Sequence, residues 1–123
     1  MTKEFVKYDQ AVALKELGFD EPCLFHTLKG EINFYNPFSL EYNIGVSAIL
    51  CQQAFRWFRE KHKQDSLVVP SGDSTGKTNG YYYEIVFDFS KENIESESFK
   101  TYEEAESACL DKLIEICKTK TNE

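Results

Sequence analysis

Long apolar runs and export signals are missing from this chain of 123 residues. No stretch approaches the roughly 18 apolar residues that a membrane-spanning helix needs. The segment from Met1 to Lys7 also lacks the apolar core and small-residue cleavage site of a secretory signal. We therefore expect no membrane insertion and a location in the cytoplasm in which the protein is made.

The residue spacings of metal and redox sites are missing as well. No two of the four cysteines have Cys-x-x-Cys spacing, and only two histidines, His26 and His62, could complete a metal site. Widely spaced cysteines among apolar neighbours, in a chain without an export signal, are typical of buried free thiols. We expect no metal and no cofactor, and four buried thiols: Cys23, Cys51, Cys109 and Cys117.

Positive charge is scarce. The chain has 14 basic and 21 acidic side chains, a net charge of −7, and its Lys and Arg residues are not gathered in sequence. A polyanion would be repelled by such a surface, so we expect no direct nucleic-acid binding. Acidic residues cluster between Lys91 and Asp111, which indicates a solvated linker leading into an exposed helix face; a nucleic-acid mimic is the alternative interpretation.

What the chain does have is enough apolar material for one core. Hydrophobic residues make up 41% of it and aromatic residues 15%, at a length close to the commonest domain size. We predict a single α+β domain over residues 1–123. Antiparallel hairpins pack with about three helices, in the order α-β-β-β-α-β-β-α.

The first half of the chain carries a helix and three strands. Apolar residues at helical spacing predict a helix over 9–18, closed by Gly18. Strands over 23–28 and 31–35 form a hairpin through Lys29 and Gly30. The expected pairs are Phe25 with Phe34, Thr27 with Ile32 and His26 with Asn33. Strict alternation predicts a third strand over 38–46.

The second half carries two helices and two strands. A helix over 47–62 should place a stripe in the core, made of Cys51, Ala54, Phe55, Phe58 and His62. A short strand over 66–69 leads into a flexible loop over 70–80, followed by a strand over 81–89 with its odd positions inward. Thr101 and Glu104 form a capping box that opens the last helix, whose apolar face includes Tyr102, and a tail over 118–123 frays.

Two nucleotide- or RNA-binding patterns are approached but not met. The segment from Gly72 to Thr78 ends in Gly-Lys-Thr, but it has three residues between its glycines instead of four and leads into a strand. The order helix, three strands, helix over 9–63 matches a double-stranded RNA-binding domain, but residues 47–53 contain no basic side chain to grip phosphates. We therefore expect neither function.

Catalytic groups are equally few. His26 could act as a general base, but no partner can be named for it. His62 and Cys51 share a helix stripe about three turns apart, too far for a hydrogen bond. We assign no catalytic residue and expect His62 to be a last-turn histidine favoured by the helix dipole.

The remaining candidate is a surface. Arg56, Trp57 and Arg59 on the middle helix, with Tyr82 on the outer face of its strand, are residue types suited to binding hot spots. Trp57 lies about 120° from the centre of the buried stripe, so we expect its indole to be partly exposed at the edge of the core.

Three segments of the chain resemble short uncharacterised proteins of phages and prophages of gut Bacteroidetes, including the crAss-like phages. The segments run from Ala13 to Cys23, from Gln53 to Lys61 and from Tyr102 to Leu110, and they cover about a third of the chain. A Thr-Tyr pair commonly opens the middle helix in that group, whereas Ile49, Leu50 and Cys51 stand here. The resemblance implies a phage or prophage origin and a bacterial host cytoplasm, but no catalytic residues.

Small phage accessory proteins often act by binding another protein, of the host or of the phage. The resulting hypothesis is a non-enzymatic protein-interaction module. A small enzyme with an unrecognised site and an acidic nucleic-acid mimic are the alternatives.

Overall fold

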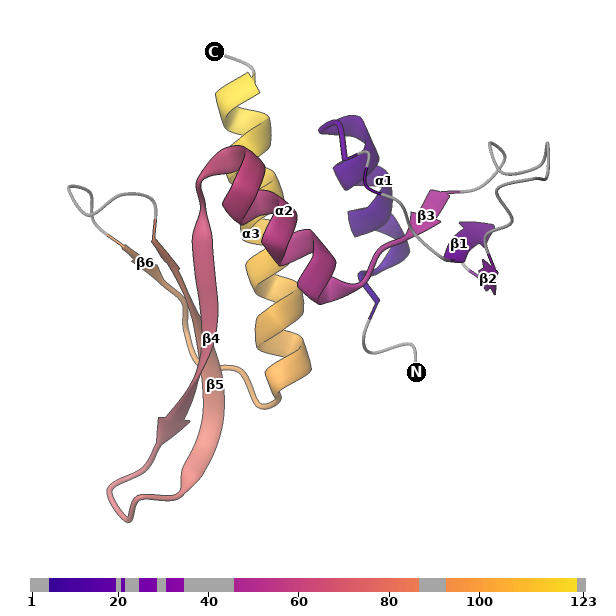
Figure 1. Ribbon diagram of the computed structural model, residues 1–123. Helices are drawn as coiled ribbons and strands as arrows, with labels where there is room; N and C mark the ends of the chain where they lie inside the picture. The colour runs from indigo at the N-terminus through magenta and orange to yellow at the C-terminus, as the bar shows by residue number, and fades with distance from the viewer. Residues whose placement is uncertain are drawn as a thin grey trace. The chain divides into compact units, whose positions relative to one another are not determined.

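The computed structural model describes residues 5–19, 21, 25–28, 31–34, 46–86 and 93–121. The chain is an α+β protein, as its sequence predicts, with helices and antiparallel strands in alternation (Figure 1). It divides into two compact units, Met1–Ala54 (unit 1) and Phe55–Glu123 (unit 2).

Unit 1 holds a helix and a three-stranded sheet. Helix α1 covers Tyr8–Glu16, and the chain leaves it through Gly18, whose φ of +99° favours glycine. Strands β1 (Phe25–Leu28), β2 (Glu31–Phe34) and β3 (Val46–Ala48) form an antiparallel sheet in the order β2-β1-β3.

The predicted register of the first hairpin is confirmed. Phe25 pairs with Phe34, His26 with Asn33 and Thr27 with Ile32. Lys29 and Gly30, the predicted turn, lie outside the described residues, as do Cys23 and Tyr35.

The middle helix begins later than predicted. Helix α2 covers Cys51–His62, whereas the sequence pattern suggests a start at Ser47. That prediction is wrong because Val46–Ala48 pairs with β1 and Leu50 bridges Phe5, so this backbone is extended. The predicted third strand over 38–46 lies outside the described residues, except for Val46.

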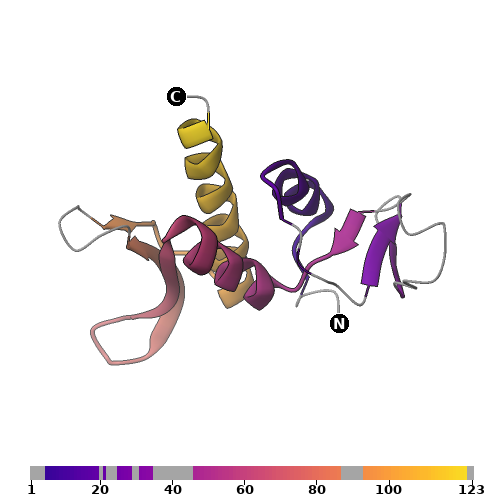
Figure 2. The same cartoon turned by 45° about the horizontal axis from the view of Figure 1, so that its top comes forward.

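Unit 2 holds a second antiparallel sheet, in the order β4-β5-β6. Strands β4 (Asp65–Gly72) and β5 (Thr78–Val86) form a long hairpin, and β6 (Ile94–Glu95) lies on the other side of β5. Helices α2 and α3 (Tyr102–Thr121) lie on one side of this sheet (Figures 1 and 2). The central strand is the second of the three, whereas in unit 1 it is the first, so the two units do not repeat one architecture.

The loop between β4 and β5 is shorter than the predicted loop over 70–80. Strand β4 continues through Gly72 and β5 begins at Thr78, so only residues 73–77 form the turn. The sequence pattern does not predict this part of β4 because Pro70 is read as a turn signal. Proline is nevertheless tolerated in a strand at the edge of a sheet.

The expected linker before the last helix is also partly strand. Ile94–Glu95 forms β6, and Phe99 bridges Tyr81 further along the same side of β5. The prediction is wrong because a two-residue strand is too short to show alternation. The order of elements therefore has one strand more than predicted.

Helix α3 opens as predicted, since the Glu104 backbone N–H donates to Thr101 Oγ1 at 3.1 Å. The helix continues to Thr121, so the fraying expected from residue 118 is wrong for 118–121. Tyr102 is 41% exposed and does not belong to the buried face. That face is formed by Ala105, Cys109, Leu110, Leu113, Ile114 and Cys117.

The core of unit 2 joins both helices to the sheet. Phe58 of α2, Ile85 of β5 and Leu113 of α3 have no exposed surface. Tyr83 and Ile85 are buried and Tyr82 and Glu84 half-exposed, so the odd positions of β5 face inward as predicted. Phe87 and Phe89, from the same prediction, lie outside the described residues.

Candidate functional site

The surface predicted from the sequence centres on α2. One side of this helix faces the core with Cys51, Ala54, Phe55, Trp57 and Phe58. At 100° per residue, these side chains span an arc of about 160°, wider than a single stripe. The opposite arc is exposed and carries Gln52, Arg56, Arg59 and Glu60.

Trp57 is buried, with 3% of its surface exposed, so the expectation of a partly exposed indole is wrong. Its ring meets Phe58 edge-on at 5.1 Å and His62 at 4.7 Å. Trp57 is buried although it lies far from the centre of the predicted stripe, because the buried arc of α2 is wider than that stripe. Trp57 stabilises the core and contributes nothing to a surface.

The segment from Arg56 to Lys63, which covers most of α2 and the residue after it, is basic. Between Arg56 and Lys63 lie four cationic side chains and one carboxylate, a local charge of +3 in a chain whose total is −7. Arg59, Lys61 and Lys63 make no ion pair with any residue that the structure describes. We call Arg56 and Arg59, which share the exposed arc, the α2 basic face.

Tyr82 lies elsewhere. It pairs with Val69 on the face of the β4-β5-β6 sheet that is turned away from α3, because its neighbours Tyr81 and Tyr83 face the helix side. The helices lie on one side of the sheet (Figure 2), and the register and the contacts of its neighbours place Tyr82 on the other side. The four predicted surface residues are therefore not brought together.

The two histidines have different surroundings. His62 lies in the last turn of α2, as predicted, half-buried against Trp57 and Phe58. His26 lies between Asn33 and Ser47 in the sheet register, but its side chain is outside the described part of the structure. Its role as a general base stays a prediction.

Three cysteines are buried free thiols, as predicted: Cys51, Cys109 and Cys117. Cys23 lies outside the described residues. Burial raises the pKa of Cys109 to about 12, although a hydrogen bond with Ser66 opposes the rise. A thiol with this pKa is not a nucleophile at neutral pH. Cys117 Sγ donates to Gln64 Oε1 at 3.6 Å.

The turn at residues 73–77 is organised around Asp73. Its Oδ1 accepts from the backbone N–H groups of Thr75, at 2.9 Å, and Lys77, at 3.1 Å. The side chain of Thr75 bonds the same carboxylate and lowers the pKa of Asp73, with help from these backbone groups. The donors that could receive a phosphate are therefore taken by a carboxylate, and a strand follows instead of a helix.

Unit 2 also has the order helix, three strands, helix that the sequence suggests for residues 9–63. The last helix of this set is α3, and its first turn carries Glu103 and Glu104. Carboxylates at this position would repel phosphates, so this order carries no support for RNA binding.

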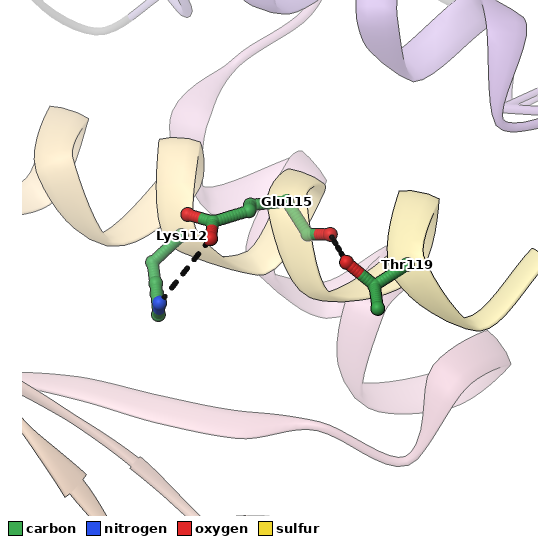
Figure 3. A network of polar contacts seen from close by, with 3 residues as sticks. All are labelled: Lys112, Glu115 and Thr119. Carbon is green, nitrogen blue, oxygen red and sulfur yellow. Dashed lines mark hydrogen bonds and ion pairs between the residues drawn. The ribbon is translucent and has the colours of Figure 1, made fainter. Parts of the chain in front are cut away.

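The acidic side chains of the stretch leading into α3 are not all exposed. Glu106 is 7% exposed and belongs to the buried side of the helix. Burial of Glu106 removes one carboxylate from the exposed array that a nucleic-acid mimic needs. Beyond the acidic stretch, Lys112 Nζ lies 3.5 Å from Glu115, and Thr119 Oγ1 donates to the Glu115 backbone oxygen (Figure 3).

No helix in the described ranges is both long and apolar enough to cross a membrane. No group of three His, Cys, Asp or Glu side chains there is arranged to hold a metal ion.

Comparisons with known proteins add no assignment. No protein-family model, no curated protein and no solved structure matches this chain.

Proposed function

We propose that the chain is a non-enzymatic protein-interaction module, a phage or prophage accessory protein of the host cytoplasm. Its contact surface is the α2 basic face, and its partner is an acidic surface on a host or phage protein. The observation that carries the proposal is the local charge of +3 between Arg56 and Lys63 in an acidic chain, with Arg56 and Arg59 together on the exposed arc of α2. The resemblance to Bacteroidetes phage proteins supports the origin.

An acidic protein fits this surface better than a nucleic acid. Beyond the segment from Arg56 to Lys63, acidic side chains outnumber basic ones, and the first turn of α3 is acidic. A polyanion of high linear charge would meet repulsion as soon as it extended past α2, whereas a small acidic patch would not.

The test compares two charge-reversal variants of equal net charge. Arg56→Glu/Arg59→Glu alters the α2 basic face, and Lys15→Glu/Lys100→Glu alters two exposed lysines elsewhere. Each tagged protein is used to capture partners from host lysate, with and without nuclease, and binding to the purified partner is then measured by calorimetry. Trp57→Ala is not a suitable variant, because truncating a buried tryptophan costs about 3–5 kcal/mol of stability.

A single acidic protein, bound directly by the wild type and by the lysine variant but at least tenfold more weakly by the arginine variant, supports the proposal. Loss of binding on nuclease treatment would replace it with nucleic-acid binding. Equal binding by all three proteins would rule out the α2 basic face as the contact surface.

A further inference from the structure

Among the strands that the structure describes, β4 forms one edge of the sheet in unit 2 and is paired on one side only. The N–H and C=O groups of Tyr81 bond Phe99, and those of Tyr83 bond Ser96, so both residues point toward β6. Because these directions alternate along a strand, Tyr82 and Glu84 point toward β4 and bond Val69 and Leu67.

The intervening residues of β4, Ser66, Val68 and Pro70, consequently turn their backbone groups away from β5. No described residue receives the N–H groups of Ser66 and Val68. Pro70 has no N–H to offer, which is why a proline is tolerated at this point of a strand.

The same edge carries an exposed apolar side chain. Leu67 is 47% exposed and lies on the face turned away from α3, next to the half-buried Val69. A strand of eight residues whose outer edge is unpaired, and which carries an exposed leucine, is a template for a further strand.

The chemistry of the paired side chains decides which register a second β4 strand would take. Antiparallel pairing centred on Val68 places Leu67 opposite Val69 and Asp65 opposite Ser71 at both ends. A centre at Val69 would instead place Leu67 opposite Ser71, and a centre at Leu67 would place Asp65 opposite Val69. Of these three registers, only the one centred on Val68 joins apolar to apolar and polar to polar side chains.

We propose that β4 pairs with β4 of a second copy of this chain, in the antiparallel register centred on Val68. The two Val68 residues exchange two hydrogen bonds, and Ser66 of each copy donates to Pro70 of the other, about four bonds in all. The missing N–H of Pro70 leaves the pairing weak. The other edge, β6, has only two residues, so the assembly stops at two copies. This inference is independent of the α2 basic face.

The test is sedimentation equilibrium of the whole chain over a range of concentrations. Leu67→Lys should abolish the dimer without harming the monomer, because the new lysine lies opposite Glu84 in its own sheet. Pro70→Val supplies one more N–H per copy and should tighten the dimer about tenfold or more.

Reversible dimerisation that follows this order of variants supports the proposal. A wild type and a Pro70→Val variant that both stay monomeric at every concentration would overturn it. A dimer that Leu67→Lys and Pro70→Val leave unchanged would also overturn it, since another surface would then be responsible. Circular dichroism of each variant confirms that the comparison is between folded proteins.

Discussion

Gly80 lies where strand β5 is approached most closely by the chain that follows β6. A Cβ at this position would lie 2.5 Å from Ser98 Oγ and 2.7 Å from the Phe99 backbone oxygen. The close approach goes with the bridge between Tyr81 and Phe99.

Gly80→Ala should therefore lower the free energy of unfolding by about 1–3 kcal/mol, because a backbone atom must move to admit the methyl group. Urea denaturation measures the change. Gly72→Ala is the matched control, since its Cβ would meet nothing closer than 3.4 Å. Equal effects of the two substitutions would show that the approach at Gly80 is not tight.

Cys109 should make stability fall at alkaline pH. The thiol ionises at its ordinary pKa of 9.0 in the unfolded chain but only near 12 in the native one. Between these values the unfolded state loses a proton that the native state keeps. The free energy of unfolding should fall by about 1.4 kcal/mol per pH unit.

Denaturation at a series of pH values, compared with Cys109→Ala, isolates this contribution. The variant should show a flatter decline above pH 9. Burial raises the pKa of Tyr83 as well, so part of the decline should persist. Parallel curves for the two proteins would contradict the assignment to Cys109.

At the scale of the element, helix α3 contains two threonines with different roles. Thr101 caps the first turn by accepting from the Glu104 N–H, whereas Thr119 donates to the Glu115 carbonyl within the helix. Thr101→Ala should cost about 1 kcal/mol of stability, measured by thermal or chemical denaturation.

Thr119→Ala is the control for that substitution. It should be nearly neutral, because alanine has the higher helix propensity and the lost bond competes with the helix. A similar loss from both variants would show that the cap is not what Thr101 contributes.

Elements whose signals are local could be predicted from the sequence. The Thr101 cap, which is half of the predicted capping box, and the pairing of Phe25 with Phe34 depend on residues a few positions apart, and both are confirmed. Strand β6 could not be found, because Ile94 and Glu95 pair only through contacts with β5 that periodicity does not encode.

The candidate site likewise has features that could be predicted from local sequence and features that depend on distant contacts. The exposure of Arg56 and Arg59 follows from helix geometry, and both are exposed. The burial of Trp57 depends on how widely neighbouring segments cover α2. The separation of Tyr82 from the arginines depends on the side of the sheet on which the helices pack. The position of β4 at the edge of its sheet could not be predicted, because it depends on which strands pair and not on the residues of β4 itself.

At the scale of the whole molecule, the division into two units can be tested directly. Among the side chains whose burial the structure describes, most of the largest fully buried ones lie in unit 2, including Phe58, Ile85, Leu110 and Leu113. We expect a fragment of residues 50–123, which keeps α2 whole, to unfold cooperatively on heating, with lower stability than the full chain. Circular dichroism would record the transition. A fragment without one would show that the chain folds as a single cooperative domain.

The chain leaves α1 and α2 through residues with a left-handed backbone, a glycine after α1 and a lysine after α2. Both residues have positive φ, +99° and +56°, and Lys63 is the one non-glycine residue in the described ranges that does. Glycine at position 63 would relieve strain of about 1 kcal/mol, so Lys63→Gly should melt at a higher temperature than the wild type. The native lysine then keeps a positive charge just after α2 at a cost in stability to the fold.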